Sequence, residues 1–151
     1  MEYKKYLDKD LIITSVKEKK KDKVLKEFSN ILSKKLHISN SEIYKQLKER
    51  ENLGSTAVGN SIAIPHCRIK TDKFEIKLLI AISKNGIDFD AIDKKPVNLF
   101  VVIIASYDSQ ASYFKVLSHL ARALQNKNLF NKLINANEAE EIYNILKNTE
   151  V

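Results

Sequence analysis

The sequence predicts a single α/β domain whose mixed central sheet is covered by helices on both faces. One observation is an apolar, β-branched run over residues 97–105, which is typical of a central strand. A second is the helical spacing of apolar residues over 22–36 and 114–124. The third is that strand-like and helical stretches mix along the chain without an internal repeat or a low-complexity linker. With 151 residues, 44% of them hydrophobic, we expect one domain over residues 1–151.

The first elements are expected to be an edge strand and a covering helix. Residues 11–13 form a short apolar run, long enough only for an edge strand. The helix over 22–36 has a lysine-rich outer face, and His37 follows it, where the helix dipole favours a cation. We expect this histidine to have a structural role. The inner face of the helix carries Val24, Leu25, Phe28, Ile31, Leu32 and Leu36.

A second helix is expected directly afterwards. Ser39 and, three residues later, Glu42 form a capping-box start. Leu53 and Gly54 mark its end, because glycine commonly stops a helix. Arg50 should therefore lie in the last turn of this helix.

Two strands are expected in the middle of the chain. Pro65 holds the residue before it in an extended conformation, so residues 61–64 should form a short strand that delivers His66 at its end. Residues 74–83 run apolar, as a buried strand does. Residues 84–86, Lys-Asn-Gly, have the chemistry of a turn after that strand.

Three aspartates follow this expected turn. Asp88, Asp90 and Asp93 could suggest a cation site, but no glycine lies inside the run and no glutamate closes it. We therefore expect these carboxylates to cap turns.

The sequence of the C-terminal part predicts three helices after the central strand over 97–105. The first is marked by apolar residues over 114–124, and the second spans residues 128–134. The third should run over 138–147 from a cap at Asn137.

The stretch over residues 49–70 carries the strongest functional signal. Two of the three glycines, one of the two prolines and the only cysteine lie in it, around His66. An imidazole facing a loop rich in free N–H groups and hydroxyls is suited to an oxyanion, and Arg50 adds a planar cation for phosphate or carboxylate. The residues alone leave a second interpretation open. His66 could be a half-buried histidine with satisfied hydrogen bonds, and Arg50 a surface ion-pair partner.

This stretch resembles a family signature. Arg50, then Leu-Gly-Ser-Thr at 53–56, Gly-Asn at 59–60 and Ala-Ile-Pro-His at 63–66 occur in the order found in the enzyme IIA domains of the fructose/mannitol class of the bacterial phosphoenolpyruvate:sugar phosphotransferase system. That class includes the nitrogen-related regulatory IIA proteins. A second block over residues 86–97 is also similar, and the resemblance runs from about residue 11 to 147.

The resemblance implies phosphoryl transfer through a phosphohistidine. His66 would accept phosphate on Nε2 from the phosphocarrier protein HPr and pass it to an enzyme IIB domain, so the protein would be a phosphotransferase. We assign stabilisation of the phosphoryl oxygens to Arg50, to the Thr56 hydroxyl and to N–H groups near Thr56. No metal or organic cofactor is implied. The alternative is a regulatory IIA protein whose phosphorylation state controls its binding to other proteins.

The chain departs from the family at one position near the site. Many members have a second histidine close to the phosphorylated one, and here Tyr113 aligns with it. Tyr113 could donate a hydrogen bond through its hydroxyl or could simply pack. His119 lies more than one and a half turns further along and should not replace it. Cys67 should point away from His66, since neighbours on a strand face opposite sides.

Composition limits the other functional classes. No apolar run reaches the roughly 18 residues of a membrane span, no secretory signal is recognisable, and one cysteine forms no internal disulfide, so we expect a cytoplasmic location without membrane insertion. The net charge of +7 leaves nucleic-acid binding as a third hypothesis. Only three of the 26 basic residues are arginines, so we expect the lysine-rich stretch over 17–26 to face water and bind no nucleic acid.

The net charge of +7 counts against docking to HPr, although local acidic residues could still form a suitable surface. HPr docks in this family through a face that the resemblance implies is basic, so an acidic rim around His66 would suit it. The candidates for this rim are Glu42, Glu49, Glu51 and Asp108.

Overall fold

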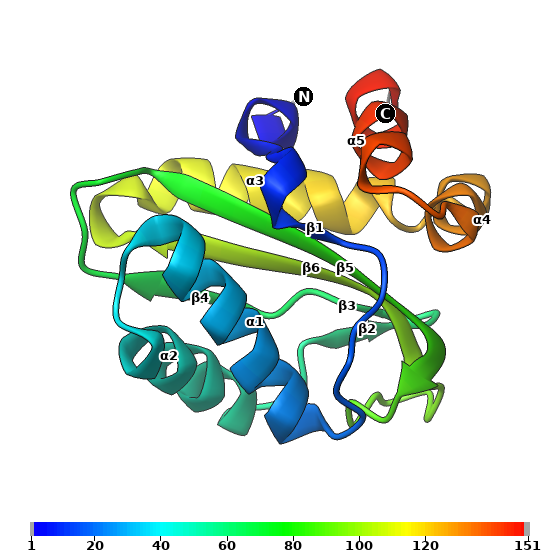
Figure 1. Ribbon diagram of the computed structural model, residues 1–151, viewed down its shortest axis with the longest axis horizontal. Coiled ribbons are helices and arrows are strands. Elements are labelled where there is room, and N and C mark those ends of the chain that lie inside the picture. The colour runs from blue at the N-terminus through cyan, green and yellow to red at the C-terminus, as the bar shows by residue number, and fades with distance from the viewer. Residues whose placement is uncertain (1, 150–151) are drawn as a thin grey trace.

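The computed structural model describes residues 2–149 and shows a single-domain α/β fold built on a six-stranded mixed sheet (Figure 1). The strand order is β1-β5-β6-β3-β2, and β4 also pairs with β6. The strands are β1 (Ile12–Ile13), β2 (Ala57–Gly59), β3 (Ile62–Ala63), β4 (His66–Ile69), β5 (Ile76–Ile87) and β6 (Val97–Ser106).

Five α-helices and three short 3-10 helices surround the sheet in the described part of the chain. Helices α1 and α2 precede β2, and α3, α4 and α5 follow β6. Their bounds are α1 (Lys21–Leu36), α2 (Asn40–Asn52), α3 (Gln110–Ala123), α4 (Lys127–Asn135) and α5 (Ala139–Asn148). The 3-10 helices are η1 (Glu2–Tyr6), η2 (Lys9–Leu11) and η3 (Tyr107–Ser109).

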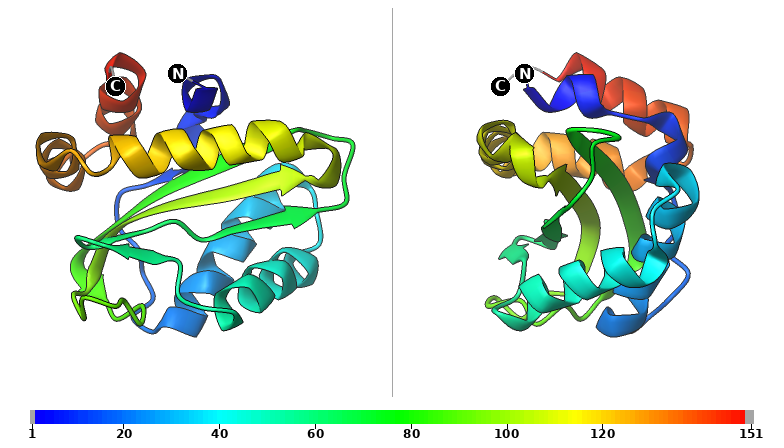
Figure 2. Two further views of the ribbon diagram at one scale, coloured as in Figure 1. Left: turned by 180° about the vertical axis from the view of Figure 1, so that it is seen from behind. Right: turned by 90° about the vertical axis from the view of Figure 1, so that its left-hand side faces the viewer.

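The sheet lies between two helical layers (Figure 2). On one face, α1 and α2 pack on a core that includes Phe28 and Phe100. On the other face, α3, α4, α5 and η1 pack on a core that includes Ile103 and Leu120 and that reaches Tyr3, which is fully buried. The expected helices on both faces and the expected central strand are confirmed, because β6 pairs with β5, β3 and β4.

The strand expected over residues 61–64 differs from the observed structure in one respect that matters for the site. β3 ends at Ala63, and His66 opens a separate strand, β4, instead of closing the first one. Pro65 has no N–H, so the ladder is interrupted there, yet its carbonyl accepts a hydrogen bond of 2.9 Å from the N–H of Ile103. The chain thus stays against β6, and His66 stands at the first position of a strand parallel to it.

Two further local expectations were wrong. Residues 84–86 do not form a turn; they lie within β5, where the register with β6 shifts and Gly86 has a φ of +81°. Glycine suits a β-bulge as well as it suits a turn. Asn137 is not the cap of α5, because Glu138 takes that position and the Asn137 side chain accepts a hydrogen bond from Lys84.

Several other expectations are confirmed. β1 is an edge strand, and the side chain of Ser39 caps α2 by accepting from the N–H of Glu42. His37 ends α1 in the left-handed conformation. The carboxylates of Asp88 and Asp93 accept hydrogen bonds from backbone N–H groups of their own loop, as expected of turn caps.

Candidate functional site: a histidine pocket at the edge of the sheet

Three elements meet around His66. The C-terminal turn of α2, the start of β4 and the start of α3 enclose an open pocket of about 590 Å³. Its lining residues are Gln46, Glu49, Arg50, Leu53, His66, Cys67, Arg68, Tyr107, Tyr113 and Phe114.

Both ring nitrogens of His66 are engaged. Nδ1 lies 2.7 Å from the carbonyl oxygen of Ile64, and Nε2 lies 3.2 Å from Nε of Arg50. A carbonyl can only accept a hydrogen bond and a guanidinium can only donate one. The proton of a neutral ring therefore belongs on Nδ1, and the lone pair of Nε2 points toward Arg50 and the pocket.

The electrostatic surroundings keep this ring neutral. Burial lowers the pKa of His66 below its usual 6.5, and the positive charge of Arg50 acts in the same direction. The hydrogen bond to Ile64 and the charge of Glu51 act in the opposite direction without reversing the shift. Neutral imidazole is the nucleophilic form, so the site holds His66 in its reactive state near neutral pH.

Arg50 is held in place by the end of its own helix. Its Nη1 donates to the carbonyl of Gly54 at 2.8 Å, while its Nε faces His66. The stop of α2 at Leu53 thus directs the guanidinium across to β4. The two residues that the sequence analysis paired, Arg50 and His66, are in contact.

Thr56 lies in the same stretch of sequence as His66, but its polar groups are bonded to Glu51. The residue is buried, its hydroxyl donates to Glu51 at 2.7 Å, and its N–H donates to the other carboxylate oxygen at 2.9 Å. Contact between Thr56 and a phosphoryl group stays a prediction, and it would require these bonds to break. Glu51 itself is buried, with its carboxylate 3.0 Å from Nζ of Lys21, so it cannot contribute to an acidic rim around the pocket.

Tyr113 lies beside His66, as its place in the sequence suggested. The two ring centroids are 5.9 Å apart, and burial raises the pKa of Tyr113 to about 12, so the phenol keeps its proton. His119 does not line the pocket. Cys67 is buried in the core on the α1 and α2 side, and burial raises the pKa of its thiol, which removes it as a nucleophile.

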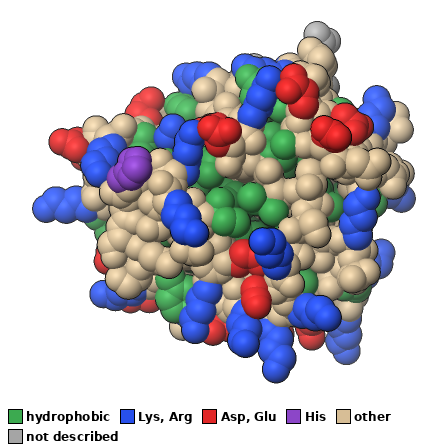
Figure 3. Space-filling model, in the orientation of Figure 1, with side chains coloured by type: hydrophobic (Ala, Val, Ile, Leu, Met, Phe, Trp, Pro, Cys, Tyr) green, Lys and Arg blue, Asp and Glu red, His purple; other side chains and the backbone are tan. Residues whose placement is uncertain are grey.

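Two residues that the structure brings to this region were not predicted from the sequence. Arg68 lies in the pocket on the same strand as His66, and the alternation of side chains along β4 was the signal for it. Lys21, assigned to a solvated lysine face, instead forms the buried ion pair with Glu51. The other lysines and arginines on the face seen in Figure 3 are spread out, with acidic side chains between them.

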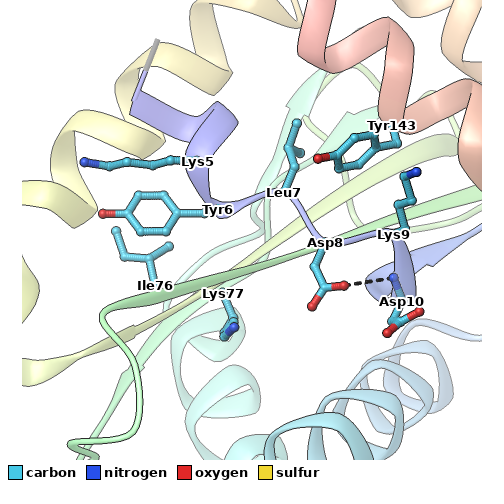
Figure 4. Close-up of a pocket in the computed structure, with 9 residues that line it drawn as sticks. All are labelled: Lys5, Tyr6, Leu7, Asp8, Lys9, Asp10, Ile76, Lys77 and Tyr143. Atoms are coloured by element: carbon cyan, nitrogen blue, oxygen red, sulfur yellow. Dashed lines mark hydrogen bonds between the residues drawn. The ribbon is translucent and has the colours of Figure 1, made fainter.

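A second hollow of about 470 Å³ lies at the opposite edge of the sheet, between η1, β5 and α5 (Figure 4). Asp8 and Asp10 line it, but both interact with Lys35, and Asp8 also accepts from the N–H of Asp10. Within residues 2–149, no group of three or more metal-ligating side chains is assembled anywhere. In the same part of the chain, every helix is too short or too polar to cross a membrane.

Comparison with known proteins agrees with the geometry. Residues 5–149 match the model of a protein family described as phosphoenolpyruvate-dependent sugar phosphotransferase system, EIIA 2. The chain belongs to this family.

Relatives of this EIIA chain include proteins with regulatory names. A nitrogen regulatory protein of Escherichia coli K12 is 32% identical over 130 residues, covering 86% of this chain and 80% of the relative. The crystal structure of nitrogen regulatory protein IIA-Ntr from Neisseria meningitidis has a TM-score of 0.87 and 27% identity, over 95% of this chain and 97% of the other.

A mannitol protein shares the fold of this EIIA chain. It is the IIA mannitol enzyme of Escherichia coli, solved in complex with phosphorylated enzyme IIB mannitol, with a TM-score of 0.76 and 20% identity. The match covers 93% of this chain and 96% of that one.

Proposed function

We propose that this protein is a phosphohistidine carrier of the phosphotransferase system, which accepts phosphate from HPr on His66 and passes it to an enzyme IIB domain. One observation carries the proposal. The Nε2 lone pair of His66 faces an open pocket beside Arg50, while Ile64 holds the ring proton on Nδ1.

The transfer requires only two bonds to change. The Nε2 lone pair attacks the phosphorus of the phosphohistidine on the donor, a new P–N bond forms, and the donor's P–N bond breaks with its electron pair returning to the donor imidazole. No electron is lost or gained, and the ring proton stays on Nδ1 of His66, hydrogen-bonded to the carbonyl oxygen of Ile64. The Nε–H of Arg50 then loses its acceptor, because the lone pair of His66 Nε2 is now bonded to phosphorus. The phosphoryl oxygens replace it as partners of the guanidinium.

The pocket rim suits a protein partner. Leu53, Tyr107 and Phe114 are exposed by 85%, 49% and 55%, and all three line the pocket that holds His66. Exposed apolar side chains around a reactive group are typical of docking surfaces. The solved complex of the mannitol relatives supports an enzyme IIB domain as the acceptor.

The test is phosphorylation of the purified protein by phosphoenolpyruvate, enzyme I and HPr, followed by intact mass and acid lability. We expect one acid-labile phosphate on the wild type and none on His66→Ala. Arg50→Ala should fold normally and accept phosphate more slowly. The carrier assignment would be wrong if the wild type took no phosphate under conditions that label a known IIA domain.

The second candidate is a regulatory protein whose phosphorylation state controls docking to another protein. The similarity to two nitrogen regulatory proteins favours it. Transfer from phosphorylated protein to a IIB domain would support the transport role. Retention of the phosphate, together with binding of only one form to another protein, would support regulation.

A further inference from the structure

Arg68 faces the same pocket as His66. The two residues lie two positions apart on β4. Burial alternates along this strand, so His66 and Arg68 are half-buried and the residues at 67 and 69 are buried. Side chains at such positions point to the same side of a strand, and their Cα atoms are about 6–7 Å apart. A long arginine side chain spans that distance easily.

Within residues 2–149, the guanidinium of Arg68 contacts an aromatic ring but has no anionic partner. Its Cζ lies 5.9 Å from the ring centroid of Tyr107, a stacking contact on an exposed aromatic. Among the residues that the structure describes, no carboxylate forms an ion pair with it. A cation in a pocket without an anionic partner is available to a ligand that carries negative charge.

Tyr113 lines the same pocket as the two arginines. Arg68 and Arg50 both act to lower the pKa of Tyr113, against the larger effect of burial. In the described part of the chain, this hydroxyl makes no hydrogen bond, although the residue is only 6% exposed. A protonated phenol beside His66 can donate a hydrogen bond to an oxygen of a phosphoryl group bound to Nε2.

We infer that Arg68 and the Tyr113 hydroxyl bind the phosphoryl group on His66 together with Arg50. The inference rests on the function proposed above and assigns two contacts to it. A phosphoryl group carries up to two negative charges and three acceptor oxygens, more than one guanidinium satisfies. Two guanidinium groups and one neutral donor match that charge and those oxygens.

The experiment compares Arg68→Gln with Arg122→Gln. Arg122 is exposed on α3, nine residues beyond Tyr113, so its variant loses the same charge outside the pocket. Each protein is phosphorylated with phosphoenolpyruvate, enzyme I and HPr, and a phosphorus NMR pH titration of the phosphohistidine is recorded. The rate of phosphoryl uptake is measured in parallel.

In Arg68→Gln, the titration midpoint of the phosphoryl group should rise, because a cation that favours its dianion is lost. Uptake should slow by roughly ten- to a hundredfold, the effect of losing a charge-assisted hydrogen bond. Tyr113→Phe should slow uptake by roughly three- to tenfold. Arg122→Gln should match the wild type in both measurements.

Equal midpoints and rates in Arg68→Gln and the wild type would overturn the inference while leaving His66 as the carrier. An absence of any adduct on the wild type would overturn the proposed function and the inference together. Should Arg68→Gln fail to fold, Arg68→Met carries the same test, because it keeps a long unbranched side chain and loses the charge.

Discussion

Glu51 follows Arg50 in the chain, yet its side chain points into the protein instead of into the pocket. Its carboxylate accepts from the Thr56 N–H, the Thr56 hydroxyl and Lys21. Lys21 also contacts Asp90, so the start of α1, the end of α2 and the loop after β5 are tied together. This cluster fixes the end of the helix from which Arg50 reaches His66.

Glu51→Ala should therefore destabilise the protein by about 3–5 kcal/mol, because it leaves two buried Thr56 donors without an acceptor and removes the buried carboxylate that pairs with Lys21. Urea unfolding measures this change in the free energy of unfolding. Asp90→Ala is the matched control. It removes the second carboxylate that pairs with Lys21. The Asp90 side chain is 74% exposed, so the loss should be about 0–1 kcal/mol. Equal losses in the two variants would refute the role given to Glu51.

The lowered pKa of His66 makes stability depend on pH. The folded protein binds a proton to this ring less readily than the unfolded chain does, so the free energy of unfolding falls as pH drops below about 6.5. The decrease ends once pH is below the folded-state pKa. His66→Gln should remove this part of the dependence.

An NMR titration tests whether the charge of Arg50 helps to lower the pKa of His66. The His66 ring should titrate below 6.5 in the wild type, and Arg50→Gln should move its midpoint upward because a nearby positive charge is lost. A midpoint at or above 6.5 in the wild type would contradict the neutral ring described here.

Single residues differ in how well the sequence predicts their contacts. Arg50 and His66 carry a recognisable pattern, and a helix end and a proline fix where each one stands. The pairing of Lys21 with Glu51 joins residues 30 positions apart, and only the packing of α1 on α2 brings them together. The sequence pattern does not show the direction of the Thr56 side chain. Thr56 lies in the predicted stretch, but its hydroxyl donates to the carboxylate of Glu51.

Among the elements, β5 shows what tertiary structure adds to local chemistry. Lys-Asn-Gly at 84–86 predicted a turn, but the strand continues through it to pair with the start of β6. A positive φ at glycine serves a bulge and a turn equally, so the sequence does not distinguish them. The long helices and β6 were predictable because their periodicity extends over many residues.

Gly86→Ala tests the bulge. A Cβ atom there would lie 2.7 Å from the Cβ of Pro96, and φ is +81°. We expect a loss of about 1–3 kcal/mol in the free energy of unfolding. Asn85→Ala, at the exposed neighbouring position, should change it by no more than about 0.5 kcal/mol. Equal effects would show that the bulge does not require glycine.

For the whole molecule, the proposed function requires a partner to reach His66 across the exposed apolar side chains of Leu53, Tyr107 and Phe114. Leu53→Ser should raise the HPr concentration needed for half-maximal phosphorylation by roughly tenfold, with the maximal rate and the stability unchanged. Ile92→Ser is the control, since Ile92 is 96% exposed and lies outside the pocket. Steady-state phosphorylation assays measure both, and an equal effect at Ile92 would contradict a docking surface around His66.

We propose that Nε2 of His66 carries the phosphoryl group while the ring proton stays on Nδ1. The most direct measurement is phosphorus–nitrogen NMR on protein labelled with ¹⁵N in histidine and phosphorylated through HPr. We expect one phosphohistidine, at His66, with phosphorus coupled to Nε2. Phosphorus on Nδ1, or on another residue, would contradict it.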